Sequence, residues 1–147
     1  MSFIHLVSMD EALVLTSSKE SAGMGVIDVR TGSALSAGFK NCIAEAGALC
    51  AIGSSTSSYS GYGSSGDYLA VAQSKKPCIN IWQWGKPQAH FQCHIQEIVT
   101  ALTADPTGAF LFAGTMKGWI YCWELSTGEL LNAFQAHFKA ITRIIVT

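Results

Sequence analysis

The chain has 147 residues, of which 49% are hydrophobic and 13% charged, and its formal net charge is −1. This composition is typical of one packed globular domain and argues against a disordered chain. The near-neutral charge, with Lys75-Lys76 as its only adjacent basic pair, argues against a protein that binds nucleic acid by neutralising phosphates. No apolar run reaches the roughly 20 residues that span a bilayer, and the first residues lack the pattern of a secretory signal.

Short apolar runs separated by turn residues predict β-strands along the chain and no long helix. Between two of these runs, Asp105-Pro106-Thr107-Gly108 predicts a tight turn, because proline presets φ at its second position and glycine closes it. The last four runs form an antiparallel meander. In chain order the runs lie at 13–15, 25–29, 48–52, 68–72, 78–82, 98–104, 109–113, 119–125 and 129–134.

Two segments repeat one pattern. Residues 79–85 read Ile-Asn-Ile-Trp-Gln-Trp-Gly, and residues 120–128 read Ile-Tyr-Cys-Trp-Glu-Leu-Ser-Thr-Gly. A fixed period of about 40–45 residues with four short strands per unit is typical of the blades of a β-propeller. The spacing between the two repeat tryptophans, Trp82 and Trp123, falls within this range.

A third, more degenerate copy precedes these two, and Ile27 takes the place of tryptophan in it. Ile27 lies further from Trp82 than Trp82 lies from Trp123, and the excess equals the length of the Gly/Ser tract 53–66. Removing the tract therefore restores the period. We interpret this tract as a surface insertion between two strands of one blade. A phosphorylation or docking site, through its serines, Tyr59 and Tyr62, is the alternative.

The predicted fold is therefore all-β: a partial WD-repeat β-propeller with about three four-stranded antiparallel blades and the first strand of a fourth. Propellers need roughly four to eight blades to close, so we expect the N-terminal part of a longer protein or a truncated product, with an apolar blade face left open. The expected bounds are 1–40 for blade 1, 47–94 for blade 2 with the loop 53–66, 97–135 for blade 3, and 139–147 for the start of blade 4.

Propeller blades of this kind hold a hydrogen-bonded set made of a histidine near the blade start, a hydroxyl, a turn acid and the third-strand tryptophan. The set satisfies buried polar groups. Lys117 stands at the acidic position of the third unit, and the second unit has no acid there, so we expect these blades to depend on apolar packing instead. The candidate residues, all with structural roles, are Ile27, Trp82, Trp123, His94, His137, Thr115, Asp105, Gly108 and Gly128.

Residues that carry chemistry are scarce. Alternation along a strand places His90 and His94 on one face and Cys93 on the other, and no second cluster completes four zinc ligands. The segment 61–66 lacks the Lys-Ser/Thr ending of a phosphate loop. No acid–base pair is placed for catalysis. The sequence predicts no enzyme, no metal and no cofactor. Its five cysteines, odd in number and irregularly spaced, favour free thiols in the cytosol or nucleus.

Four stretches carry a more specific likeness: the tryptophan-poor first unit that ends Val-Ile-Asp-Val-Arg-Thr-Gly, and the segments 66–73, 99–108 and 119–131. In this order they resemble the WD-repeat protein 18 family, the WD-repeat subunit of a nuclear complex that matures the large ribosomal subunit. They cover most of residues 12–147. The departures are the Gly/Ser insertion, Gln83 in place of an acid, and the missing later blades.

This resemblance implies a non-catalytic scaffold in pre-60S assembly and in processing of the rRNA internal transcribed spacer. It implies protein subunits of that assembly as partners, including a helical-repeat protein and a dynein-like ATPase, and a nuclear location, with a cytoplasmic pool as an alternative. No membrane partner and no direct nucleic-acid site are expected. The alternatives are a WD-repeat adaptor in another complex, such as a ubiquitin-ligase substrate receptor or a trafficking coat, and an enzyme on an all-β scaffold.

Overall fold

The computed structural model describes two parts of the chain at different depth. Residues 31–33, 50, 52, 68–73, 76–83 and 88–147 are described with their side chains, and the strands at 2–6, 11–17, 22–28, 39–40 and 49–52 are otherwise described by their backbone pairing. None of the described residues lies in a helix that is long and apolar enough to cross a membrane.

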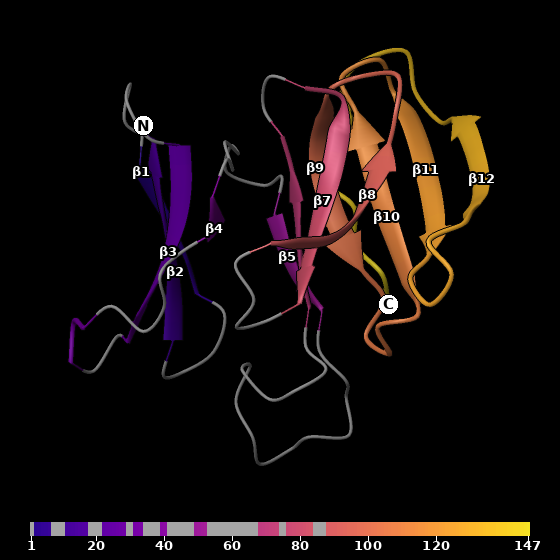
Figure 1. The fold of residues 1–147 in the computed structure, drawn as a ribbon. Coiled ribbons are helices and arrows are strands. Elements are labelled where there is room, and N and C mark those ends of the chain that lie inside the picture. The colour runs from indigo at the N-terminus through magenta and orange to yellow at the C-terminus, as the bar shows by residue number, and fades with distance from the viewer. Residues whose placement is uncertain are drawn as a thin grey trace.

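The described strands form three four-stranded antiparallel sheets, each a meander in chain order (Figure 1). This arrangement confirms the predicted partial propeller fold. The first sheet contains β1 (Ser2–Leu6), β2 (Glu11–Ser17), β3 (Ala22–Asp28) and β4 (Phe39–Lys40); the second contains β5 (Leu49–Ile52), β6 (Tyr68–Ala72), β7 (Cys78–Gln83) and β8 (Ala89–His94); the third contains β9 (Val99–Ala104), β10 (Phe110–Thr115), β11 (Trp119–Glu124) and β12 (Leu130–Gln135).

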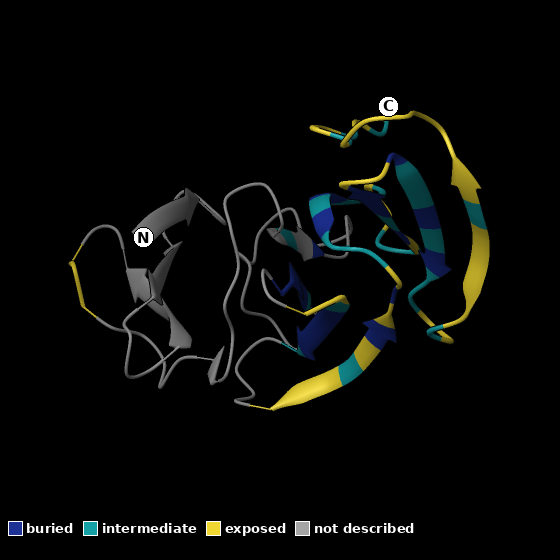
Figure 2. Cartoon of the chain, turned by 90° about the horizontal axis from the view of Figure 1, so that it is seen from above, coloured by how far each residue is buried: buried dark blue, intermediate teal, exposed yellow. Residues whose placement is uncertain are grey.

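The second and third sheets share one apolar core. Strand β9 lies against β5 and β6, so the innermost strand of the third sheet meets the inner strands of the second. Buried side chains from both sheets fill the space between them, and Figure 2 shows them between the more exposed outer strands β8 and β12. The core includes Ile52, Ala70, Ala72, Ile79, Ile81 and Cys93 from the second sheet and Val99, Leu102, Leu111, Ala113, Tyr121 and Trp123 from the third.

The second sheet is buried on both of its faces. Ala70 and Ile81 pair across β6 and β7 and face the third sheet, whereas the neighbouring pair, Leu69 and Trp82, faces the other way. Their exposed fractions are all 2% or less. A strand buried on both faces should read as an apolar run rather than an alternation, and Cys-Ile-Asn-Ile-Trp in β7 is apolar except for Asn80, which is itself buried.

The chain leaves the second and third sheets in the same way. After β8, the Ile95 amide donates to the carbonyl of Pro77 at 3.2 Å. After β12, the Ala136 amide donates to the carbonyl of Gly118 at 2.9 Å. The donors Ile95 and Ala136 are separated by the same number of residues as Trp82 and Trp123, and so are the acceptors Pro77 and Gly118. The repeat period is therefore also a period of backbone hydrogen bonds.

Residues 139–147, expected to open a fourth blade, form no strand. The backbone amide of Ile141 donates to the carbonyl of Thr115 at 3.0 Å, and the hydroxyl of Thr100 donates to the carbonyl of Ile141 at 2.5 Å. The segment is therefore tied to β9 and β10. It has no strand ladder, because among the described residues no neighbouring strand of its own sheet lies beside it.

Gly118 is the most constrained glycine of the described part. Its φ is +83°, and a Cβ built on it would overlap the carbonyl of His137 and lie 2.8 Å from the carbonyl oxygen of Lys139. We expect Gly118→Ala to lower the free energy of unfolding by about 3 kcal/mol or more, because a left-handed φ and a backbone collision both disfavour a side chain.

Gly128→Ala is the matched control for this substitution. Its φ is +74°, but its nearest neighbour, the Phe91 ring, would lie at an ordinary 3.7 Å. Gly128→Ala should lower the free energy of unfolding by only about 1 kcal/mol, which is the cost of placing a side chain at a left-handed φ. Urea unfolding of both variants measures the difference, and equal losses would show that the contact with 137–139 does not hold the turn.

Candidate interaction surfaces

The two repeat tryptophans occupy equivalent buried places. Trp123 on β11 and Trp82 on β7 are each 2% exposed; Trp82 faces away from the third sheet, and Trp123 faces the second sheet. The Trp123 ring stacks on Tyr121, with ring centroids 5.6 Å apart and an angle of 14° between planes. Ile27, which takes this place in the first unit, lies on β3 opposite Ala12, and its side chain lies outside the described residues.

Thr115, His94 and His137 do not join the tryptophans in a hydrogen-bonded set. The Thr115 hydroxyl is fully buried and accepts from the backbone amide of Trp119 at 3.1 Å, which closes the turn between β10 and β11. His137 is exposed, and its Nδ1 accepts from the amide of Lys139 at 3.2 Å. His94 is exposed at the end of β8, opposite Cys78. Thr115 and His137 therefore stabilise local turns, and His94 marks a strand end.

Asp105 organises the turn between β9 and β10. Its carboxylate accepts from the amide of Phe110 at 2.7 Å, from the amide of Thr107 at 3.2 Å and from the hydroxyl of Thr107. Burial raises the pKa of the Asp105 carboxyl, but these hydrogen bonds and one from Ala109 favour the charged form and together lower its pKa below the usual value. Gly108, with φ at +74°, donates its amide to the Asp105 carbonyl at 3.0 Å and completes the turn.

Gly128 closes the corresponding turn between β11 and β12. It adopts a φ of +74°, and its amide donates to the carbonyl of Glu124 at 2.8 Å. The Glu124 carboxylate accepts from the Thr127 hydroxyl at 2.7 Å. Acidic side chains therefore accept hydrogen bonds within both turns at this end of the third sheet.

The thiols of the described residues are poor nucleophiles. Burial raises the pKa of the Cys50 thiol to about 12 and that of the Cys93 thiol to about 11. Among the residues that the structure describes, no three His, Cys, Asp or Glu side chains gather into a group that could hold a metal ion. His90 and His94 are exposed on β8 and Cys93 is buried on the opposite face.

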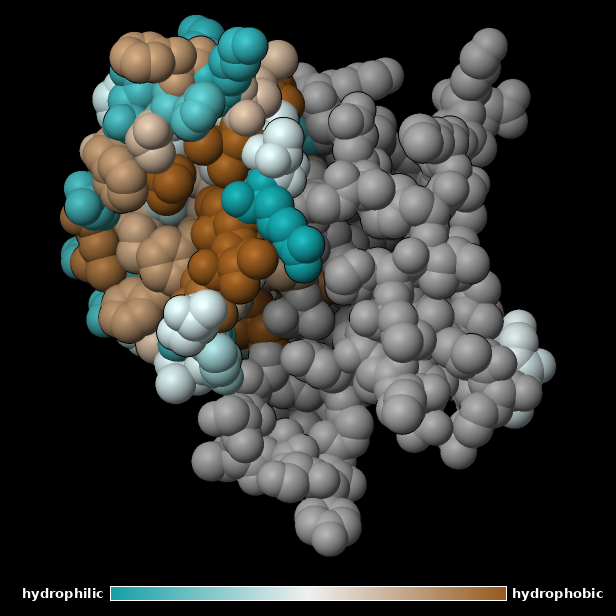
Figure 3. Space-filling model, turned by 180° about the vertical axis from the view of Figure 1, so that it is seen from behind, coloured by the Kyte–Doolittle hydropathy of each residue, from teal (hydrophilic) through white to brown (hydrophobic). Residues whose placement is uncertain are grey.

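The third sheet has an open face, which we define as the side turned away from the second sheet. It carries Phe110, Phe112, Ile120, Cys122 and Phe134, paired across β10, β11 and β12. Phe110 and Phe134 are 37% and 48% exposed. On the second sheet the equivalent face is covered by the third sheet, and Ile79, Ile81 and Cys93 there are at most 3% exposed. Figure 3 shows apolar residues gathered in the described part of the chain, as seen from behind.

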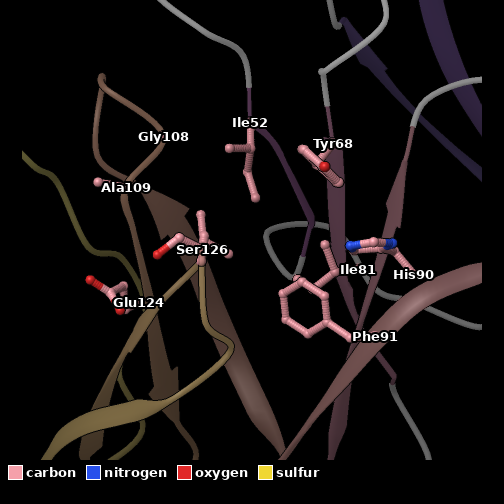
Figure 4. A pocket seen from close by; sticks show the side chains of 10 residues that line it. Ile52, Tyr68, Ile81, His90, Phe91, Gly108, Ala109, Glu124 and Ser126 are labelled. Atoms are coloured by element: carbon pink, nitrogen blue, oxygen red, sulfur yellow. The ribbon is translucent and has the colours of Figure 1, made fainter.

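A small pocket lies between the second and third sheets, at the end where the β9–β10 and β11–β12 turns lie. Its volume is about 270 Å³, slightly below the range of roughly 300–1,000 Å³ typical of ligand sites. In Figure 4, Tyr68, His90 and Phe91 form one wall, Ala109 and Ser126 lie opposite, and the carboxylate of Glu124 points away from the gap. The pocket can hold one side chain, and the carboxylate of its acidic lining residue, Glu124, accepts from the Thr127 hydroxyl.

The comparisons with known proteins point to one group. No family model matches the chain. WD repeat-containing protein 18 of Danio rerio is 38% identical over 96 residues, which are 65% of this chain and 22% of that protein. Pre-rRNA-processing protein pro-1 of Caenorhabditis elegans is 32% identical over 96 residues, 65% of this chain and 18% of that protein. This chain is a homologue of the WD repeat-containing protein 18 and pro-1 proteins.

Another similar protein has a different name. Protein ROOT INITIATION DEFECTIVE 3 of Arabidopsis thaliana is 33% identical over 139 residues, 92% of this chain and 29% of that protein. The chain thus spans less than a third of the length of these relatives. The crystal structure of the computationally designed Ika8 protein superposes with a TM-score of 0.66 over 98% of this chain and 39% of that one, at 17% sequence identity. That likeness shows the fold alone.

Asp105 gives the third sheet a dependence on acid pH. The pKa of the Asp105 carboxyl is lower in the folded chain than in the unfolded chain, where it is about 3.9. The charged carboxylate therefore stabilises the fold fully above the unfolded pKa, and this stabilisation is lost as the pH falls through the folded pKa. We expect Asp105→Asn to be less stable than the wild type at pH 7 by up to about 1 kcal/mol, since the turn is solvent-exposed. The difference should vanish near pH 2.

Thermal unfolding of both proteins from pH 7 to pH 2 measures this effect. Thr107→Val, which keeps the carboxylate but removes one donor, should reproduce part of the loss at pH 7. A constant difference between Asp105→Asn and wild type at every pH would contradict the assignment.

The C-terminal segment is seated on the open face at Gly114. A Cβ built on Gly114 would lie 2.6 Å from the Cβ of Ile141 and would overlap its Cγ2 atom. We expect Gly114→Ala to lower the free energy of unfolding by about 1–3 kcal/mol through overpacking. Ile141→Ala should relieve most of that loss in the double variant, and additive losses in the double-mutant cycle would show that the two residues do not touch.

Proposed function

We propose that the protein is a non-catalytic interaction scaffold in pre-rRNA processing and in assembly of the large ribosomal subunit. The observation that carries the proposal is the homology of this blade segment to proteins named for pre-rRNA processing, in animals and in fungi. We infer that the protein works in the nucleus, in the nucleolus or nucleoplasm.

The architecture supports a scaffold. The buried repeat residues are used for packing and turn closure, and of the two thiols with the most strongly raised pKa values Cys93 lies in the core and Cys50 packs against it. The described residues present turns, an exposed outer strand and an apolar open face, which are surfaces for other proteins rather than a catalytic centre. We propose protein subunits of a pre-60S assembly complex as partners, among them a helical-repeat protein and a dynein-like ATPase.

The test is affinity purification of the tagged full-length protein from nuclear extract, followed by gradient sedimentation. Large-subunit precursors and spacer-containing pre-rRNA should co-purify, and depletion of the protein should raise the amount of unprocessed spacer. Trp123→Ala, which removes a core ring and costs about 3–5 kcal/mol, should abolish the association, whereas Ser126→Ala on the surface should retain it.

Co-purification of ubiquitin-ligase or coat subunits without ribosomal precursors would replace this proposal with the adaptor function. Normal spacer processing after depletion would count against it equally.

A further inference from the structure

Three lysines that are far apart in the sequence gather at one end of the second and third sheets. We call this the connector end: it holds the β6–β7 turn, the β10–β11 turn, and the segments that follow β8 and β12, and it lies at the top of Figure 1. Lys76 lies in the first turn, Lys117 in the second and Lys139 after β12, and all three are exposed. His94 and His137 are exposed at the same end.

The repeat itself places these lysines together. Lys76 and Lys117 are one repeat period apart and precede Pro77 and Gly118, whose carbonyls hold the equivalent backbone hydrogen bonds. Lys139 is brought beside Lys117 because Gly118 accepts from the amides of Ala136 and His137 and contacts the backbone of Lys139. A basic surface thus arises from separate turns of successive blades, so the linear sequence shows no run of positive charge.

The acidic and basic residues of the described turns lie at different ends of the sheets. Asp105, Glu124 and Glu129 lie in or beside the turns at the opposite end. The acid at the connector end, Glu97, is half-buried and accepts from the Tyr121 hydroxyl at 3.0 Å. Among the described turn residues, the lysines therefore lie at one end of these two sheets and the three acids at the other.

An aromatic ring and a thioether project from the same positive end. Phe138, between His137 and Lys139, is 93% exposed, and Met116, beside Lys117, is 53% exposed. Lysines combined with an exposed aromatic ring suit single-stranded RNA, because the lysines neutralise phosphates while an unpaired base stacks on the ring. An acidic protein segment would use the lysines but would have less need of an exposed ring.

We propose that the connector end binds the backbone of single-stranded RNA through Lys76, Lys117 and Lys139, with Phe138 as a stacking platform. This inference rests on the proposed function, because the RNA available to such a scaffold is the spacer of the ribosomal precursor. Three phosphate contacts give a weak, sequence-independent and salt-sensitive interaction. On single strands each contact contributes about 0.7 to the slope of log K against log salt concentration.

The experiment measures binding of the purified full-length protein to a fluorescent single-stranded 20-nucleotide RNA between 50 and 200 mM salt. The test variant is Lys76→Gln/Lys117→Gln/Lys139→Gln, which keeps the side chains long and polar and removes three positive charges. We expect at least a tenfold loss of affinity at 50 mM salt and a slope smaller by about 2. Phe138→Ala should weaken binding while leaving the slope unchanged, because it removes stacking and no charge.

The matched control is Gln88→Glu/Ala89→Glu/Ser126→Glu. These residues are exposed and lie away from the connector end, and the triple variant makes the net charge more negative by the same amount as the lysine variant. It should change affinity less than threefold. An equal loss in this control, or an unchanged slope in the lysine variant, would overturn the proposal, as would a lysine variant that keeps RNA binding but loses a protein partner.

The two proposals fail separately in these assays. If large-subunit precursors co-purify but RNA binding does not depend on the three lysines, the scaffold function is supported and the RNA-binding surface is contradicted. RNA binding that depends on the lysines in a protein that never meets ribosomal precursors would do the reverse.

Discussion

The packing of the third sheet against the second determines most of what this structure shows. A four-stranded sheet of this kind has two apolar faces, and its own strands can cover neither of them. Trp123 and Leu111 are buried because Ile79 and Ile81 lie opposite, and those isoleucines are buried for the same reason. Burial is therefore a property of neighbouring sheets, and each face depends on the sheet beside it.

The same dependence explains the open face. Residues such as Ile120 and Phe134 repeat the positions of Ile79 and Cys93, which are buried where the third sheet covers them. Ile141 already covers Gly114 at one corner of that face. The open face thus has the side chains of a blade-to-blade contact, which distinguishes it from an ordinary patch of exposed apolar residues.

Sequence reasoning succeeded where local chemistry decides the structure. The spacing of Trp82 and Trp123 predicted the repeated sheets, and the run Asp105-Pro106-Thr107-Gly108 predicted a turn whose carboxylate and glycine take their expected parts. Such signals lie within a few residues of each other or repeat at a fixed interval. Their interpretation does not depend on which residues pack against them in the fold.

The sequence was less informative where the structure of a residue depends on neighbours that are distant along the chain. The sequence names Thr115 as a structural hydroxyl but does not say which group it bonds; in the structure it accepts from the nearby amide of Trp119. Residues 139–147 carry a strand-like pattern, but a strand needs a partner along its edge. The lysines of the connector end form no run in the sequence for a related reason, because only the stacking of successive blades brings Lys76, Lys117 and Lys139 to one end.

Pro77 and Gly118 hold the same place in successive units although they are opposites in conformational freedom. Both residues supply the carbonyl oxygen that accepts this hydrogen bond, although Gly118 also donates its own amide to the Thr115 carbonyl and has no room for a Cβ. The main-chain acceptor is therefore the same in both units while the residue that carries it differs. In chains as diverged as this one, backbone carbonyl acceptors that recur at a fixed interval can therefore identify repeat units that a comparison of side chains misses.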